Sequence, residues 1–323
     1  MTMTHPHATG RRTVMGSALA GLGLAAASTG AVAQVAAPPM PAQPVADPTR
    51  AMLQPLPQQR PATKGSIDLG GGAKLGYWDT GAPTPDAQTI ILLHPGTGSH
   101  AIWGYQQPVL AQAGYRVIGY SRRGYLDSPA GEGPTGTAAG DLLALVDQLK
   151  IDRFHMVGSA AGAIVGADFA LSHPARLRSA VFACTHMGIT DPEYLAMSNG
   201  LRPKGFAEMP AEFREVGPSY RAVNPEGVKQ WVELEHKALE GGKRVFQGTL
   251  NTITWAALRQ MKVPSLLIGG DADLWAPPSV FRQFAAAIPG STLLILPETG
   301  HSGYWEQPEA FNQAVLRFIG QHR

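Results

Sequence analysis

From about residue 65 onward, the sequence alternates short, continuous apolar runs with stretches of helical periodicity. Runs of Val, Ile and Leu without polar alternation are typical of parallel strands covered on both faces. Strands that alternate with helices build a doubly wound, mostly parallel sheet. After a predicted hairpin (SIDL and KLGYWDTG), the runs are TIILLHPG, YRVIGYS, FHMVGSA, RSAVFACTH, PSLLIGGD and STLLILPE. The pattern predicts an α/β fold with an eight-stranded sheet, whose ligands bind at the carboxyl ends of the strands.

One stretch interrupts this alternation. Residues 187–261 contain no convincing strand and hold helical patterns with Met, Phe, Trp and Tyr among charged residues. A helical insertion at the carboxyl ends of two strands would cover the ligand site as a cap. Helices that add only packing are the alternative. We expect a helical cap at about 187–261, because the insertion falls on the side of the sheet where ligands bind.

The first 33 residues have the composition of an export signal. Arg11 and Arg12 precede a Gly- and Ala-rich apolar run, and AVAQ offers a cleavage site after Ala33. Twin arginines before such a run resemble a Tat-type signal peptide. The run is too short and too weakly apolar for a spanning helix. We therefore expect residues 1–33 to be a removed signal, the mature protein to be periplasmic, and no stable membrane anchor.

The composition of the chain also bears on its linker, its partners and its disulfides. Residues 34–64 are rich in Pro and Ala, which predicts an extended linker before a folded domain at 65–323. The formal net charge of +2, without a long basic run, predicts no nucleic-acid partner. Cys184 is the only cysteine, so no intrachain disulfide is possible, and its apolar run predicts a small buried side chain.

Residues 155–166, HMVGSAAGAIVG, contain a strand, a tight turn and the start of a helix of small residues. In the G-x-S-x-G pattern, the central residue is a serine whose hydroxyl attacks the substrate. Ala160 occupies that position here, so this corner is predicted to lack the nucleophilic oxygen. Ser159, one residue earlier, is the backup nucleophile, but neighbouring side chains along a strand point to opposite faces.

Four further segments carry a resemblance to a known family. LLHPGTGSHAIW resembles a His-Gly loop that follows a third strand. VIGYSRRGYLDS resembles a strand and loop whose usual sequence is Asp-x-Arg-Gly-x-Gly-x-Ser. GDADLWAPP resembles an acid loop, and PETGHSGYWEQPEAF a histidine loop with the final helix. Together with their order along the chain, these segments resemble the α/β-hydrolase fold family over about residues 65–323. The sequence departs from the family at Ser121, which replaces the Asp, and at Leu126, which replaces the second Gly.

The resemblance implies that Asp273 and His301 are the catalytic acid and base. A buried carboxylate that accepts from one imidazole nitrogen fixes the tautomer and leaves the other nitrogen free to take a proton. Asp271 is the competing acid, but the family pattern matches the second Asp of GDAD, and Asp271 is expected to cap the turn.

The resemblance also implies an oxyanion hole, which needs two backbone N–H groups directed at developing negative charge. One donor comes from the residue after the nucleophile, here Ala161. The other comes from the loop after the third strand, where Pro95 has no N–H to give. Gly96 is therefore the expected second donor.

An alanine at this corner leaves several functions open. We expect a hydrolase of an ester, lactone or activated C–C bond, in which His301 and Asp273 activate water or substrate directly. The alternatives are a cofactor-free lyase, an inactivated serine esterase, and a non-catalytic pseudoenzyme that binds a small ligand.

The expected partner is a small molecule. Trp103, Trp275 and Tyr304 lie in loops at the site end, and they predict an apolar or aromatic substrate. No cofactor is expected. The two histidines of HPGTGSH have no third ligand nearby that would predict a metal, and GGG at 70–72 precedes no helix, unlike a dinucleotide-binding loop.

Overall fold

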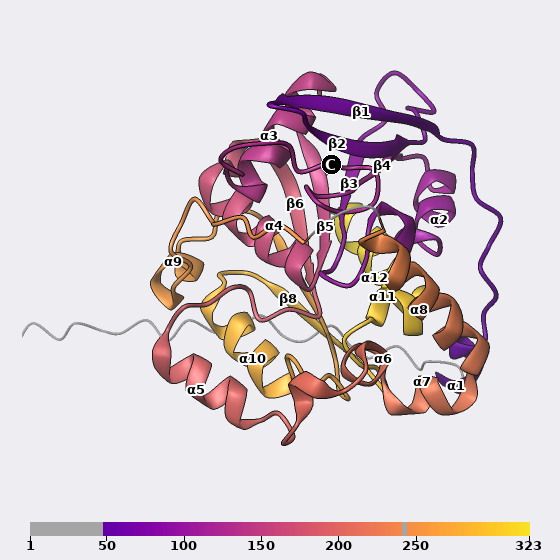
Figure 1. Ribbon diagram of the computed structural model, residues 1–323, viewed down its shortest axis with the longest axis vertical. Coiled ribbons are helices and arrows are strands. Elements are labelled where there is room, and N and C mark those ends of the chain that lie inside the picture. Colours follow the sequence, from indigo (N-terminus) through magenta and orange to yellow (C-terminus); the bar gives the residue numbers. More distant parts are fainter. Residues whose placement is uncertain (1–47, 241–243) are drawn as a thin grey trace, which may run out of the picture. The chain divides into compact units, whose positions relative to one another are not determined.

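The computed structural model describes residues 48–240 and 244–323, and a single eight-stranded sheet lies at its centre (Figure 1). In spatial order, the strands are β1 (Thr63–Gly70), β2 (Ala73–Asp79), β4 (Arg116–Tyr120), β3 (Thr89–Leu93), β5 (Phe154–Ser159), β6 (Leu177–Ala183), β7 (Ser265–Gly270) and β8 (Thr292–Leu296). The first two form an antiparallel hairpin, and β2 is antiparallel to β4. All pairs from β4 to β8 are parallel. The predicted fold class is confirmed.

Helices cover both faces of the sheet (Figure 1). In chain order, they are η1 (His100–Trp103), α2 (Gln107–Gln112), α3 (Ala138–Gln148), α4 (Ala161–Ser172), η2 (Pro174–Arg176), α10 (Pro278–Ala287), α11 (Gly303–Glu306) and α12 (Pro308–Ile319). Along β3, Ile91 and Leu93 join the core beneath α3, α4 and α10, whereas Ile90 and Leu92 join the core beneath α2 and α12. Because both faces are buried, the strands read as continuous apolar runs in the sequence.

Between β6 and β7 the described residues form helices and no strand, and we call this segment, residues 187–261, the cap. Its helices are α5 (Pro192–Gly200), η3 (Phe206–Glu208), α6 (Ala211–Glu215), α7 (Pro218–Val223), α8 (Pro225–Ala238) and α9 (Trp255–Arg259). Two of its aromatic side chains, Tyr220 and Trp231, are fully buried in the same core as α12. The cap is therefore packed firmly onto the sheet domain.

Residues 48–64 of the extended linker predicted at 34–64 contain regular structure, and residues 34–47 lie outside the described residues. Within it, the chain forms α1 (Pro48–Met52), and β1 already begins at Thr63. Met52 is 2% exposed, and its carbonyl accepts a hydrogen bond from Asn224 Nδ2 at 2.6 Å. One apolar anchor and backbone hydrogen bonds thus fix a segment whose composition alone suggested a free chain.

The signal peptide predicted at 1–33 lies outside the described residues. Across residues 48–240 and 244–323, no helix has both the length and the apolar character needed to span a bilayer.

Candidate active site

The corner between β5 and α4 has an unusual backbone conformation. Ala160 has φ 50° and ψ −116°, a region that costs a residue with a Cβ on the order of 1–3 kcal/mol. Its N–H donates to Ala183 O at 2.9 Å. Glycine is required at Gly162, where a Cβ would lie 2.1 Å from Leu93 O, and at Gly158, where it would meet the backbone of α4. Close packing therefore maintains the sharp strand-to-helix corner that the sequence predicts, in spite of the strain at Ala160.

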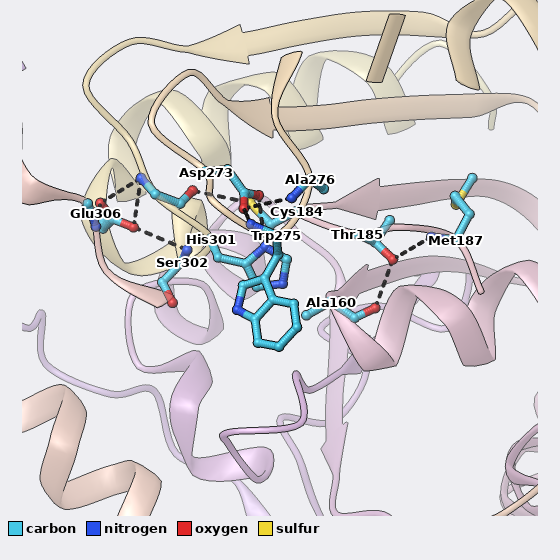
Figure 2. A network of polar contacts seen from close by, with 12 residues as sticks. Ala160, Cys184, Thr185, Met187, Asp273, Trp275, Ala276, His301, Ser302 and Glu306 are labelled. Atoms are coloured by element: carbon cyan, nitrogen blue, oxygen red, sulfur yellow. Dashed lines mark hydrogen bonds and ion pairs between the residues drawn. The ribbon is translucent and has the colours of Figure 1, made fainter. Parts of the chain in front are cut away.

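Hydrogen bonds stabilise this corner from its carbonyl side (Figure 2). The carbonyl of Ala160 accepts from Thr185 Oγ1 at 3.0 Å and from the N–H of Ala163 at 3.1 Å. The Thr185 hydroxyl oxygen in turn accepts from the N–H of Met187 at 3.0 Å. The conformation of Ala160 is thus held in place by the loop that follows β6.

Ser159, the backup nucleophile, lies inside the sheet. It is the last residue of β5 and is 0% exposed. Among the described residues, its hydroxyl has no hydrogen-bond partner, and it does not line the cavity next to Ala160. The structure therefore does not bring Ser159 and His301 together.

Asp273 and His301 do come together (Figure 2). His301 Nδ1 donates to Asp273 Oδ2 at 2.8 Å, and the aspartate is 2% exposed. The other carboxylate oxygen, Oδ1, accepts from the N–H groups of Trp275 at 2.7 Å and Ala276 at 3.0 Å. The competing acid, Asp271, is exposed and accepts from Thr299 N at 3.4 Å. The geometry gives Asp273 the orienting position beside the imidazole.

The surroundings of His301 shift its protonation equilibrium. Burial by itself would lower the pKa of the imidazole. The negative charge and hydrogen bond of Asp273, together with the charges of Glu215 and Glu306, outweigh burial and raise the pKa above its ordinary value. The protonated imidazole that forms after proton transfer is therefore stabilised in this site.

Glu306 organises the loop that carries His301 (Figure 2). Its carboxylate accepts from the N–H of Gly300 at 2.9 Å, of Ser302 at 3.1 Å, and of Gly217 in the cap at 2.8 Å. The Gly217 and Gly300 backbones touch, since a Cβ on Gly300 would lie 2.4 Å from Gly217 N. One buried carboxylate thus joins the histidine loop to the cap.

The two predicted oxyanion donors lie close together. A Cβ on Gly96 would lie 3.7 Å from the Ala161 Cβ, and both residues line the same cavity. Among the described residues, no hydrogen bond uses the N–H of Gly96 or that of Ala161, the first residue of α4. The two N–H groups are therefore available to a ligand atom beside Ala160.

A cavity of about 220 Å³ joins these groups, and we call it the elbow pocket. It is lined by Gly96, Thr97, Ala160, Ala161, Ile164, His186, Arg214, Glu215, Glu235, Arg244, Trp275 and His301. His301, Ala160, Gly96 and Ala161, which were predicted as the base, the corner and the oxyanion donors, therefore line one small cavity.

Sequence reasoning missed several polar residues of this pocket. Glu215, at the end of α6, is 6% exposed and faces the cavity from the cap. His186 lies three residues beyond β6 and lines the elbow pocket. Because ligands bind at the carboxyl ends of parallel strands, its position in the sequence could have marked it as a candidate. Burial lowers the pKa of His186 to about 4, so its imidazole is neutral. No periodicity or motif marks Glu215 or Arg244, because the packing of the cap determines their positions.

Only one of the three aromatic residues predicted to bind substrate lines the elbow pocket. The Trp275 ring lies 6.0 Å from the His301 ring, centroid to centroid. Trp103 and Tyr304 are almost fully buried and pack against each other at 5.0 Å in the core beneath α12. The prediction for Trp103 and Tyr304 is corrected, since the position of a loop does not determine which way its side chains point.

The loop departures noted in the sequence also have structural consequences. Leu126 has φ 40°, so a branched residue occupies a conformation that favours glycine, and its N–H donates to Ala238 O of the cap at 2.8 Å. His94 is buried and hydrogen-bonded through both ring nitrogens, to Pro95 O and the N–H of Arg122. No cluster of potential metal ligands occurs in residues 48–240 and 244–323.

A groove of about 700 Å³ adjoins the elbow pocket, with which it shares Gly96, Ala161, Ile164 and Arg244. Arg122 donates to Pro95 O at 3.2 Å, and Arg244 donates to Gly96 O at 2.9 Å. In the described part of the chain, neither arginine forms an ion pair with a carboxylate. The groove therefore combines apolar surface from α4 with two guanidinium groups that form no ion pair, beside Arg123, which is paired with Asp141.

Comparisons with known proteins show the family and the fold. A family model described as "Alpha/beta hydrolase family" matches residues 90–314. The 2-hydroxy-6-oxononadienedioate/2-hydroxy-6-oxononatrienedioate hydrolase of Paraburkholderia phymatum is 28% identical over 287 residues, which cover 78% of this chain and 94% of that protein. Among solved structures, a hydrolase from Pseudomonas aeruginosa PA01 is 27% identical with a TM-score of 0.65, covering 80% of this chain and 98% of the other. An enol-lactonase from Burkholderia xenovorans LB400, at 24% identity and a TM-score of 0.63, shares the fold over 79% of this chain and 100% of its own.

Proposed function

The chain belongs to the alpha/beta hydrolase family, and on that premise we propose that it hydrolyses an ester, lactone or activated C–C bond without forming a covalent enzyme intermediate. In this proposal, His301 and Asp273 activate a water molecule, because Ala160 occupies the position of the usual serine. The relatives are named as hydrolases of small molecules, which supports the reaction class.

One observation carries the proposal. His301 Nδ1 is engaged by Asp273, whereas no described residue forms a hydrogen bond with Nε2, and this imidazole shares a small cavity with Ala160. A methyl group leaves room where a serine hydroxyl would stand. General-base hydrolysis requires an oriented base beside a space for water, and His301 beside the methyl group of Ala160 supplies both.

The proposed reaction has two steps. Nε2 of His301 takes a proton from water as the water oxygen bonds to the substrate carbonyl carbon, and Asp273 stabilises the resulting imidazolium. The N–H groups of Gly96 and Ala161 donate to the oxyanion. When the carbonyl re-forms, the bond to the leaving atom breaks with its electron pair on that atom, which receives one proton in balance for the one that His301 took from water; the products are an acid and the protonated leaving group.

The proposed substrate is a small molecule with an apolar or aromatic part. Trp275 and Ile164 offer apolar surface beside the reacting position, and Arg122 and Arg244 in the groove suit a polar end.

The test compares two variants on p-nitrophenyl butyrate. His301→Ala is expected to abolish turnover, whereas Ser159→Ala retains most of it, because Ser159 does not line the elbow pocket. A fluorophosphonate probe should leave the wild-type protein unlabelled, since no serine oxygen is positioned beside the base. Full activity in His301→Ala refutes the mechanism, and labelling that Ser159→Ala removes identifies Ser159 as the nucleophile.

We also propose that the enzyme works in the periplasm. The twin arginines and the Gly- and Ala-rich run of residues 1–33 support this location.

A further inference from the structure

Glu215 is a buried carboxyl group that the hydrolytic mechanism does not yet use. It is 6% exposed and lines the elbow pocket together with His301 and Ala160. Glutamate is rarely buried unless it is paired, because an ionised carboxylate loses its hydration on burial. A buried titratable group at a cavity with a catalytic base is therefore a candidate for a chemical role.

The packing between cap and sheet domain fixes Glu215 relative to His301. Glu215 lies two residues before Gly217, and His301 lies one residue after Gly300. These two glycines are in backbone contact and share the Glu306 carboxylate as acceptor, at 2.8 and 2.9 Å. The acid from the cap and the base from the histidine loop are therefore held on either side of one rigid junction.

Glu215 differs from Glu306, although both carboxyl groups are buried. Glu306 accepts hydrogen bonds from three backbone N–H groups, which explains its burial structurally. Among the described residues, no Lys or Arg forms an ion pair with Glu215, and no backbone N–H donates to its carboxyl group. Among the described residues, the indole N–H of Trp275, which also lines the elbow pocket, has no hydrogen-bond partner and therefore does not pair with Glu215 either. Nothing in its packing therefore requires a carboxyl group here.

The charged groups around Glu215 act in opposite directions. Burial raises its pKa above the ordinary value, and Asp273 adds to this effect, whereas His301 and Arg214 oppose it. His186, Glu235 and Arg244 also face the same cavity. The balance favours a carboxyl group that retains its proton to higher pH than an exposed glutamate.

We propose that Glu215 is the proton donor to the leaving atom of the substrate, so that the two proton transfers of the reaction are divided between the sheet domain and the cap. This inference rests on the proposed hydrolytic function. In serine hydrolases a single histidine performs both transfers. Here an acid from α6 faces the base across the cavity, and each group performs one transfer.

The proton balance closes over one turnover. His301 takes a proton from the attacking water, and the oxyanion forms at Gly96 and Ala161. As the bond from the carbonyl carbon to the leaving atom breaks, the electron pair stays on the leaving atom and the Glu215 carboxyl proton moves to it. The proton on His301 then passes to the Glu215 carboxylate, directly or through water, which restores both groups.

The test varies the leaving group in wild-type enzyme and Glu215→Gln, with p-nitrophenyl, phenyl and benzyl butyrate as probes. The p-nitrophenolate ion leaves without protonation, so its ester should lose little activity in the variant. Benzyl alkoxide needs a proton, so turnover of benzyl butyrate should fall by about 10²–10⁴-fold. Glu215→Asp should restore part of that loss, and the matched control Glu212→Gln, on the same helix but outside the elbow pocket, should behave as wild type.

A loss of equal size on all three esters overturns the proposal, because a purely structural role does not depend on the leaving group. Wild-type enzyme that turns over none of the esters refutes the hydrolytic function in its ester form, and a second readout then decides whether Glu215 carries the proton. In an NMR titration without substrate, the carboxyl carbon signal of Glu215, identified by its loss in Glu215→Gln, should titrate at a higher pH than that of an exposed glutamate, because Glu215 is buried beside the elbow pocket. A Glu215 carboxyl group that titrates like an exposed glutamate overturns the proposal.

Discussion

Replacement of Ala160 by serine tests whether the elbow pocket is intact catalytic machinery. The backbone of Ala160 already has φ 50°, and serine and alanine have the same Cβ, so the substitution adds no new backbone strain. Ala160 lines a cavity of about 220 Å³, which accepts one oxygen atom without displacing a neighbour. We therefore expect the free energy of unfolding to change by less than about 1 kcal/mol.

The expected gain in activity follows from two opposing magnitudes. Loss of the nucleophile from a serine enzyme costs about 10⁶-fold in turnover, or roughly 8 kcal/mol of transition-state stabilisation. General-base activation of water by His301 recovers about 10²–10⁴-fold of that loss. The net expectation for Ala160→Ser is thus a gain of about 10²–10⁴-fold on p-nitrophenyl butyrate, with a burst of p-nitrophenol.

The assay combines burst kinetics with fluorophosphonate labelling, which should become stoichiometric in Ala160→Ser. The double variant with His301→Ala should remain unlabelled, because the serine is then not activated. A folded Ala160→Ser protein that gives neither labelling nor a burst contradicts the reasoning. In that case the imidazole and the corner do not form a working pair.

Two further predictions concern other parts of the chain. Burial raises the pKa of Glu306 to about 7. Between the ordinary glutamate pKa of 4.5 and pH 7, the folded protein therefore holds a proton that the unfolded chain has released. The free energy of unfolding of the wild-type protein should thus fall as the pH rises from about 4.5 to 7 and level off above. Glu306→Gln should remove this fall and lower Tm even at about pH 5, as measured by thermal unfolding at several pH values, and an unchanged pH slope would count against the assignment. Replacement of Arg11 and Arg12 by lysine should keep the precursor in the cytoplasm, as shown by cell fractionation, whereas normal export of that variant would rule out a Tat-type route.

The sequence was sufficient for those parts of the site that local pattern determines. Continuous apolar runs predicted the parallel strands, and short motifs at their carboxyl ends located Gly96, Ala160, Asp273 and His301. Each of these residues lies one to five residues beyond the end of a strand, so the strand largely sets its position. Local sequence thus determines where Asp273, His301 and Ala160 lie, whereas their catalytic roles stay predictions.

Residues placed by long-range packing were not predictable in the same way. Glu215 reaches the elbow pocket because Gly217 and Gly300 touch, and no pattern within the cap encodes that contact. Trp103 and Tyr304 were assigned to the substrate although they bury each other in the core. Likewise, Met52 anchors a Pro-rich segment whose average composition suggested no fixed structure.

The Glu306 junction has a consequence for engineering by domain exchange. Its carboxylate accepts from Gly217 of the cap and from Gly300 and Ser302 of the histidine loop. The backbones of Gly217 and Gly300 are in contact, so a cap from another protein without a glycine at this position would displace the histidine loop. In chimeras between relatives, Gly217, Gly300, Ser302 and Glu306 should therefore come from the same parent. A chimera that takes Gly217 from one parent and the other three residues from another is expected to fold but to be inactive.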